Sequence, residues 1–323
     1  MIYSSSDTLV SIIINNYNYE RFLADAINSA LAQTYQQTEV IVVDDGSVDD
    51  SREVIKSYGS QVIAVFKDNG GQASALNAGF AVSKGEIICL LDADDAFLPE
   101  KVSEVVKLFN SHPGIDWVFT ESAPVESNGL VNTNLEAVSK NSSAPGSVSS
   151  PRKIDFRDNL RNAELPNFTP STSNLCFSRA ILEKMFPIPE VKGLSGIAIC
   201  DTYLNLLVVG LGIGVVTTQN LGIFRLHQNN RFTTQEANKK RKIFSEILIA
   251  TAYWIRIKFP EFGKLSKKLF SKGLGIYFRS KSSNETFDKM IKEHLSNISF
   301  LDRLEVGLMT FYYFLKLLFS KAA

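Results

Sequence analysis

Residues 87–95 of this chain read IICLLDADD, five apolar residues followed by three carboxylates within four positions. A run of five apolar residues is typical of a buried strand, so the acids stand where that strand leaves the core. Packing does not require so much like charge in one place, whereas a divalent cation or a cation-bridged pyrophosphate does. The stretch therefore indicates a chain that handles a nucleotide and a metal ion.

Apolar runs and helical repeats alternate on both sides of this stretch. The sequence predicts strands over residues 10–14, 39–43, 61–66, 87–91, 117–120 and 221–226. It predicts helices over residues 19–33, 72–83, 99–110 and 300–319, and a further helix capped by Asp49 or Asp50. Short strands that alternate with helices are typical of an α/β fold, so we expect a mostly parallel, doubly wound sheet flanked by helices.

Polar clusters follow three of the predicted strands. Residues 15–18, the pair Asp44 and Asp45, and residues 92–95 each come directly after an apolar run. In doubly wound sheets, ligands bind beyond the carboxyl ends of the strands. We therefore expect the three clusters to converge on one crevice.

The composition is that of an ordinary globular protein, but the charge is unevenly distributed. The 323 residues allow one large domain or one domain and a smaller one. Hydrophobic residues make up 45% and charged residues 21%, and the formal net charge of zero names no partner. Residues 239–281 hold twelve Lys and Arg against two acids, a local balance of +10 that leaves −10 for the rest. An acidic N-terminal body is thus joined to a basic C-terminal segment.

The cysteines and the apolar segments bear on location. Cys89, Cys176 and Cys200 form no CxxC pair, which is typical of reduced thiols in a cytoplasmic protein. The first seven residues lack the basic start and the apolar core of a signal peptide. The apolar run over residues 306–315 is shorter than the ~18–20 residues that a membrane span requires. We therefore expect a cytoplasmic protein.

Residues 122–152 predict a long loop, which is either a mobile flap or a plain surface loop.

Four motifs stand in a fixed order: VSIIINNYN at residues 10–18, VVDDGS at 42–47, NGG at 69–71 and DADD at 92–95. In this order and at this spacing they resemble the family 2 inverting glycosyltransferases. The resemblance is dense over residues 8–110, sparser to about residue 230, and absent beyond it. It implies the A-type glycosyltransferase fold, which binds a nucleotide-diphospho-sugar. It also implies a catalytic domain over residues 1–230, with a nucleotide-binding half over about 1–120 and an acceptor half over about 121–230. Beyond it the residue pattern turns helical, which predicts a basic helical segment over 231–323.

The resemblance assigns nucleotide-binding roles to four residues. Asp45, with Asp44 beside it, would hydrogen-bond the base, and uridine fits because a carboxylate accepts the imide N–H of uracil. Tyr17 would stack on or border the base, and Asp92 would face the ribose. Apart from the resemblance, residues 44–47 also suit a turn with a helix cap, and Tyr17 suits a core position.

The resemblance also implies a site for Mg²⁺ or Mn²⁺. Asp94 would bind the ion that bridges the diphosphate, and Asp95 would either ligate it or support its ligands. His227, in the run Phe-Arg-Leu-His at residues 224–227, would contact the metal or the diphosphate. The departing nucleoside diphosphate gains negative charge, which a dication stabilises by several kcal/mol. The alternatives are a charged loop at a strand end and a structural histidine.

Asp201 matches the residue that serves family members as the general base. That base takes the proton of the acceptor hydroxyl, which attacks the anomeric carbon with inversion and gains about 10²–10⁴-fold in rate. Cys200 stands where the family usually has Glu, and Asn15 and Asn16 stand where many members have Pro-Thr. A helix-capping role for Asp201 stays an alternative.

The resemblance further implies a nucleotide-sugar donor and a saccharide or lipid-linked acceptor, and no nucleic-acid partner. Four polar residues lie where acceptor-side loops commonly sit: Ser171, Thr172, Ser173 and Asn174. Residues 239–323 lie outside the resemblance, and their basic charge and aromatic end suggest peripheral contact with an anionic membrane at the inner face of the plasma membrane. A solvated basic face with a core helix is the alternative.

Together these observations predict a metal-dependent inverting glycosyltransferase that moves a sugar from a UDP-sugar to a hydroxyl group. The resemblance implies a role in bacterial cell-surface polysaccharide synthesis. Two rivals remain. A nucleotidyltransferase on a related fold usually has a Gly-rich, basic loop after the first strand, and residues 15–18 do not provide one. A non-catalytic sugar-nucleotide-binding protein does not require the intact set of acids. A dinucleotide oxidoreductase fits poorly, because no GxGxxG follows Ile14.

Overall fold

The structure is a computed structural model that describes residues 8–126, 150–168, 170–191, 200–228, 230, 235–280 and 284–319. It divides into two compact units. The first unit is formed from residues 1–156, 168–188 and 207–228, and the second from residues 157–167, 189–206 and 229–323. The second unit therefore groups two short internal segments with the C-terminal helices. The division at residue 230 stays a prediction, and most of the loop at residues 122–152 lies outside the described residues.

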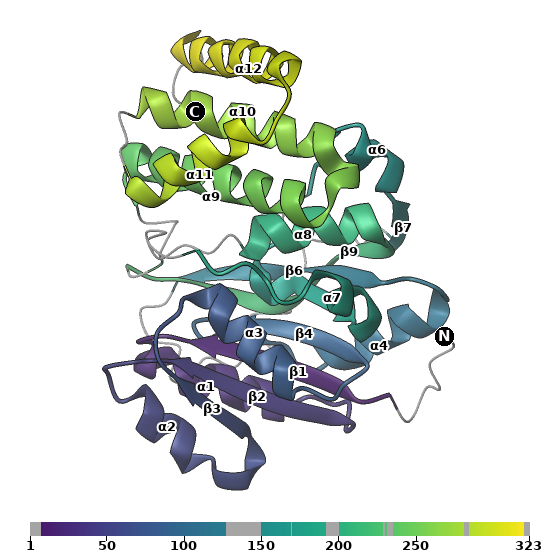
Figure 1. The fold of residues 1–323 in the computed structure, drawn as a ribbon. Helices are drawn as coiled ribbons and strands as arrows, with labels where there is room; N and C mark the ends of the chain where they lie inside the picture. The colour runs from purple at the N-terminus through teal and green to yellow at the C-terminus, as the bar shows by residue number, and fades with distance from the viewer. Residues whose placement is uncertain are drawn as a thin grey trace. The chain divides into compact units, whose positions relative to one another are not determined.

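Nine strands of the described chain form one sheet in the first unit (Figure 1). Four neighbouring strands are parallel, in the order β3 (Ile63–Lys67), β2 (Thr38–Asp45), β1 (Val10–Asn16) and β4 (Ile87–Asp92). In this register Asn15 lies opposite Asp92, and Asn16 lies opposite Asp44. The polar ends of β1, β2 and β4 are therefore side by side, as the sequence predicted.

The remaining strands make the sheet mixed. β8 (Leu175–Ser178) runs antiparallel to β4 and to β6 (Trp117–Glu126), and β9 (Ile213–Leu226) runs parallel to β6. β5 (Ala96–Phe97) and β7 (Arg152–Asp155) are antiparallel to β9. The predicted α/β sheet flanked by helices is confirmed, with its parallel pairings in the four-strand block and between β6 and β9.

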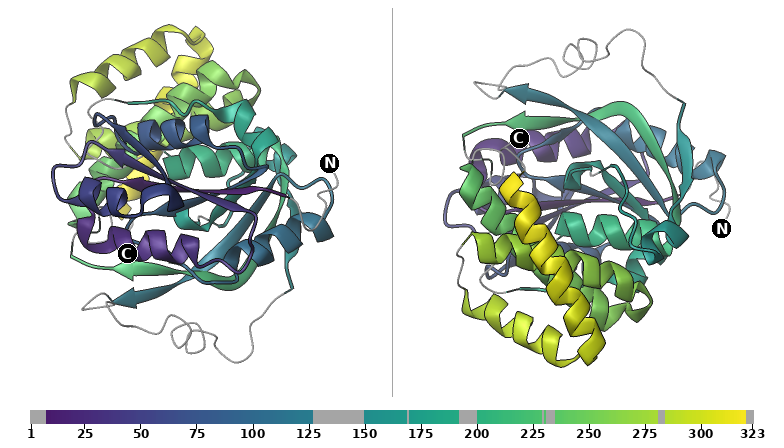
Figure 2. Two further views of the ribbon diagram at one scale, coloured as in Figure 1. Left: turned by 90° about the horizontal axis from the view of Figure 1, so that it is seen from below. Right: turned by 90° about the horizontal axis from the view of Figure 1, so that it is seen from above.

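Helices cover both faces of the parallel block. Successive side chains of β1 point to opposite faces of the sheet, so its apolar side chains are buried against a helix on each side. Ile12 and Ile14 share a core cluster with Leu23 of α1 (Glu20–Leu31). Ile13 meets α3 (Gln72–Val82), where a Cβ on Gly79 would lie 2.5 Å from Ile13 Cγ2. The helices α1 and α3 therefore lie on opposite faces (Figure 2, left). The other helices of this unit are α2 (Ser51–Ser57), α4 (Lys101–Ser111) and α7 (Arg179–Met185).

The second unit is helical. α10 (Gly263–Arg279) packs against α9 (Ala237–Lys258) and α12 (Phe300–Phe319), and α11 (Glu285–Ser296) packs against α9. α12 approaches α10 closely at Gly275, where a Cβ would lie 2.9 Å from the carbonyl oxygen of Thr310 (Figure 2, right). The unit also contains α6 (Arg157–Arg161) and the start of α8 (Cys200–Leu211). These helices confirm the predicted C-terminal helical extension. Among the described helices, none is both long and apolar enough to cross a membrane.

Candidate functional site

Three carboxylates cluster at the carboxyl end of β4. Asp92, Asp94 and Asp95 offer ligand oxygens that all lie within 4.8 Å of one another. The backbone N–H of Asp95 donates to the carbonyl of Asp92 at 3.0 Å, which turns the chain back on itself directly after the strand. Carboxylate oxygens at this spacing fit a hard divalent cation, which also relieves the repulsion among the three like charges.

Asp92 is held from three directions. Its Oδ1 accepts hydrogen bonds from Asn15 Nδ2 at 3.0 Å and from Gln72 Nε2 at 2.9 Å. Its backbone N–H donates to Ser173 Oγ at 3.1 Å. The amide side chain of Asn15, one of the departures from the family pattern, therefore orients the first acid of the cluster.

Asp95 is almost completely buried, and both of its carboxylate oxygens have donors. Ser173 Oγ donates to Oδ2 at 2.6 Å, and the backbone N–H of Arg225 donates to Oδ1 at 3.1 Å. Burial, followed by the charge of Asp94, raises the pKa of Asp95 to about 7. These contacts favour a supporting role over direct ligation, and a metal contact by Asp95 stays a prediction.

His227 meets Asp94 across 133 residues of sequence. His227 Nε2 lies 3.1 Å from Asp94 Oδ2, and the histidine ring packs against Phe22 with 4.6 Å between ring centroids. Arg225 fixes the same loop: its Nε donates to the carbonyl of Asp94 at 2.8 Å, and its guanidinium pairs with Asp25 at 2.9 Å. The end of β9 thus brings an imidazole to the acid cluster, and carboxylate oxygens with an imidazole nitrogen are a ligand set that a divalent metal ion can use.

Asp44 lies at the carboxyl end of β2 and is fully buried. Burial is the largest influence and favours the neutral acid, but hydrogen bonds from Ser47, Arg52 and Asn16 outweigh it and lower the pKa of Asp44. Arg52 Nε lies 2.9 Å from Asp44 Oδ2, and Asn16 Nδ2 donates to Oδ1 at 3.0 Å. Asp44 is therefore an ionised anchor that ties the ends of β1 and β2 to the start of α2.

Asp45 organises the loop that precedes α3. Lys67 Nζ and the backbone N–H of Gly70 bind Oδ1 at 2.6 and 3.0 Å, and the backbone N–H of Gly71 binds Oδ2 at 2.7 Å. The Asp45 side chain is 3% exposed. Tyr17 is half-buried just after β1. Contacts of Asp45 and Tyr17 with a nucleotide base stay predictions.

One of the predicted acceptor residues, Ser173, contacts both Asp92 and Asp95. Thr172, Ser173 and Asn174 form a short 3₁₀ turn, η3 (Thr172–Asn174), and are buried, while Ser171 is half-buried. Asn174 Oδ1 accepts from Thr120 and Ser122, and Asn174 Nδ2 donates to Ser171 Oγ. The turn therefore supports the acid cluster, and its contact with an acceptor stays a prediction.

A buried lysine, Lys101, contacts this turn. Lys101 Nζ donates to the carbonyl of Ser173 at 2.8 Å and to Thr120 Oγ1 at 2.9 Å, and it lies 4.4 Å from the centre of the Phe97 ring. Burial lowers the pKa of Lys101. Neither Lys101 nor Gln72 was predicted from the sequence, because no local pattern shows that a lysine in a helix reaches a turn 72 residues away.

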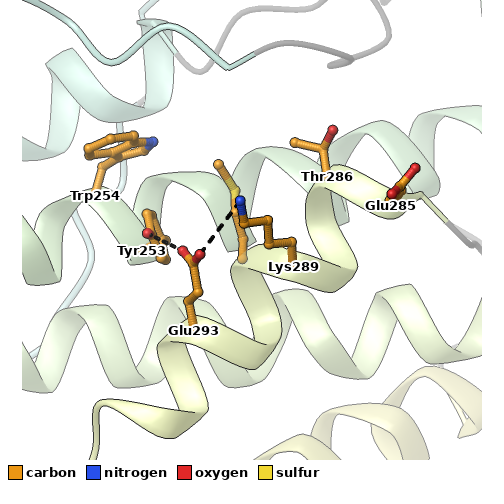
Figure 3. A pocket seen from close by; sticks show the side chains of 7 residues that line it. Tyr253, Trp254, Glu285, Thr286, Lys289 and Glu293 are labelled. Atoms are coloured by element: carbon orange, nitrogen blue, oxygen red, sulfur yellow. Dashed lines mark hydrogen bonds and ion pairs between the residues drawn. The ribbon is translucent and has the colours of Figure 1, made fainter.

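Asp201 lies in the first turn of α8, within the second unit. Its role as general base stays a prediction. The second unit has a pocket of its own, of about 410 Å³, between α9 and α11 (Figure 3). Within the pocket the Tyr253 hydroxyl donates to Glu293 at 2.7 Å, and Lys289 Nζ lies 4.0 Å from the same carboxylate. None of the predicted site residues lines this pocket.

A family model and several curated relatives match this chain. A family model described as Glycosyl transferase family 2 matches residues 11–186. An uncharacterized glycosyltransferase of Nostoc sp. is 33% identical over 242 residues, which is 73% of this chain and 71% of the relative. An uncharacterized glycosyltransferase of Rickettsia prowazekii is 44% identical over 102 residues, 32% of each chain. The chondroitin synthase of Pasteurella multocida is 39% identical over 129 residues, 39% of this chain and 13% of the synthase.

Solved structures of similar fold match nearly the whole chain at low identity. S. aureus TarS in complex with UDP-GlcNAc has a TM-score of 0.60 at 15% identity, covering 95% of this chain and 89% of that one. This chain spans about half (54%) of a longer TarS chain. The mannosyltransferase PcManGT of Pyrobaculum calidifontis, in complex with GDP-Man and Mn²⁺, has a TM-score of 0.50 at 15% identity, covering 98% and 88%. These likenesses confirm the predicted fold.

Proposed function

Because the chain belongs to glycosyl transferase family 2 and is therefore a glycosyltransferase, we propose that it transfers a sugar, with inversion, from a UDP-sugar to a hydroxyl group of a saccharide or lipid-linked acceptor. The family match favours a glycosyltransferase over the nucleotidyltransferase and the non-catalytic binding protein considered from the sequence.

The observation that carries the metal-dependent part of the proposal is the meeting of Asp94 and His227 beside Asp92. Two oxygen donors and one imidazole nitrogen come together there from β4 and the end of β9. Asp94 and His227 would hold Mn²⁺ or Mg²⁺, with Asp95 supporting them from behind. When bound, such a dication offsets the charge that grows on the departing diphosphate.

The donor would lie along the carboxyl ends of β1, β2 and β4. Asp92 would face the ribose, and Asp45 with Asp44 and Tyr17 would border the base. The fold itself does not choose the base, since TarS was solved with UDP-GlcNAc and PcManGT with GDP-Man. Our preference for uridine rests on Asp45, whose carboxylate would accept the imide N–H of uracil, a ring donor that adenine and cytosine lack.

The acceptor hydroxyl would lose its proton to Asp201 as it attacks the anomeric carbon from the face opposite the diphosphate. A general base must lie within hydrogen-bond reach of the proton that it removes. Ser171, directly before η3, would contribute to the acceptor side together with Thr172, Ser173 and Asn174 of η3. The relation to a chondroitin synthase supports a saccharide acceptor. We further propose that the chain acts in cell-surface polysaccharide synthesis, in the cytoplasm.

A thermal-shift panel of nucleotides tests the donor and the metal together. We expect UDP to raise the melting temperature of the full chain in the presence of Mn²⁺, with little change from UDP without the ion, because the diphosphate needs the bridging charge. ADP and CDP serve as controls. A response to GDP alone would overturn the uridine assignment, and an equal response to UDP with and without Mn²⁺ would overturn the metal-dependent one.

A further inference from the structure

The last described helix, α12, carries an exposed apolar stripe. Six large apolar side chains along it are more than half exposed: Phe300, Leu301, Leu304, Leu308, Phe311 and Tyr312. Their spacing of three, four and one places them on a single face of an α-helix. No charged residue lies between them on that face, and contiguous apolar patches of this kind mark interaction sites.

The opposite face of α12 is already occupied. Val306 is buried, and Thr310 and Tyr313 lie against Gly275 of α10, where an added Cβ would meet both at 2.9 Å. The helix is thus apolar on two sides, one packed within the second unit and one facing outward. A helix that needed only to complete its unit would carry polar residues on the outward side.

The charges around the stripe are asymmetric. The two acids of α12, Asp302 and Glu305, both pair with Lys267 of α10, at 2.6 and 2.5 Å. Lys316 is exposed at the other end of the helix. Burial, followed by the charges of Lys268 and Lys316, lowers the pKa of Lys272, so these three lysines lie near one another. The two acids beside the stripe are therefore paired with Lys267, and Lys316 is an exposed cation at its other end.

We propose that α12 lies flat on an anionic phospholipid surface, with the apolar stripe in the headgroup region and the neighbouring lysines against the lipid phosphates. An interfacial helix needs both features, an uninterrupted apolar face and basic residues beside it. A second copy of the chain is the competing occupant of the stripe, and the oligomeric state measured below distinguishes it from a lipid surface. The proposal goes beyond the transferase activity and does not depend on it.

Co-sedimentation of the full chain with vesicles tests this docking. We expect binding to vesicles of phosphatidylcholine with phosphatidylglycerol, at roughly tenfold higher partitioning than to phosphatidylcholine alone, and weaker binding at high salt. The double variant Leu304→Gln with Leu308→Gln should lose roughly tenfold or more, since both side chains are exposed in the free protein. Lys316→Gln should weaken binding to the anionic vesicles only.

Matched variants keep this test decisive. Ile257→Gln changes an apolar side chain of α9 that is 54% exposed, and Lys107→Gln changes an exposed lysine of the first unit, so both should bind as the unsubstituted chain does. Circular dichroism and melting temperature confirm that each variant is folded. The proposal is overturned if the unsubstituted chain binds neither vesicle, if the double variant binds as well, or if light scattering shows a dimer that the double variant abolishes.

Discussion

At the scale of single residues, the pair formed by Asp94 and His227 is the most diagnostic contact of the candidate site. Asp94→Asn keeps the size of the side chain but removes the charge that a dication requires. We expect Mn²⁺-dependent nucleotide binding to be lost and turnover to fall by roughly 10³-fold, in line with the several kcal/mol that a metal supplies. Isothermal titration with UDP and Mn²⁺ measures the binding.

The matched control for this variant is Asp158→Asn, which makes the same change on a side chain that is 91% exposed. It should bind UDP and Mn²⁺ as the unsubstituted chain does. Equal affinity of the Asp94 variant and the control would remove Asp94 from the metal site.

Asp201→Asn addresses the general base. Because a base acts on the acceptor hydroxyl and not on the nucleotide, we expect unchanged donor binding and a loss of about 10²–10⁴-fold in turnover. Released UDP measures the turnover, and thermal shift measures donor binding. Turnover within threefold of the unsubstituted enzyme would leave Asp201 with the helix-capping role.

At the scale of elements, Gly79 sets how closely α3 approaches the sheet. A helix-interior Gly→Ala change ordinarily stabilises a protein by about 0.5–1 kcal/mol. At Gly79 the new Cβ would lie 2.5 Å from Ile13 Cγ2 and 3.1 Å from Val43 Cγ2. We therefore expect Gly79→Ala to lower the free energy of unfolding in urea by about 1–3 kcal/mol instead of raising it. The new Cβ would clash with β1 and β2, and these paired strands cannot move apart to make room.

Gly307 of α12 provides the matched control, since a Cβ there would meet no atom within 4 Å. Gly307→Ala should therefore show the ordinary helix stabilisation. A stabilising effect at both positions would mean that α3 does not lie as close to β1 as the structure places it.

The elements differ in how far the sequence predicted them. The strands of the parallel block and the helices α1, α3 and α12 were predicted within a few residues, because the strands are short apolar runs and the helices are longer segments that begin or end at polar or turn residues. β5 and β7, of two and four residues, were missed because such short strands carry no period of their own. β9 was predicted over its last six residues only, since Thr217 to Asn220 read as polar, yet pairing with β6 continues across a register shift.

At the scale of the whole molecule, the sequence predicted that the strand-end acids meet but not what holds them. The parallel order of β1, β2 and β4 follows from local patterns, and it brings Asp44 and Asp92 to one edge. Ser173 and Arg225 reach Asp95 from 78 and 130 residues away. Contacts at such separations depend on where β8 and β9 enter the sheet, which no local pattern specifies.

Protonation of a buried histidine should make stability depend on pH. His294 stacks on Phe270 with 3.7 Å between ring centroids, and burial, followed by the charge of Arg256, lowers the pKa of His294 to about 4. Because this value lies below the unfolded value of 6.5, the unfolded chain binds the proton first and stability falls as the pH drops from 6.5 towards 4. We expect the free energy of unfolding to be about 2 kcal/mol lower at pH 5 than at pH 7.

The variant His294→Phe keeps a ring against Phe270 and removes the proton site, so its urea midpoint should change less between the two pH values. His112→Gln, at the end of α4, serves as the control and should keep the full dependence. Identical pH dependence in His294→Phe and the unsubstituted chain would assign the effect to other groups.

The distance in sequence between the acids and their supports has a consequence for synthesis. A ribosome that has released the first 120 residues has delivered Asp45, Asp92 and Asp94, but Ser173, Arg225 and His227 are still to be made. Until then Asp95 has neither of its two long-range donors. The nascent chain can therefore fold its parallel strands early, yet the acid cluster takes its final shape only after β9 has emerged and paired.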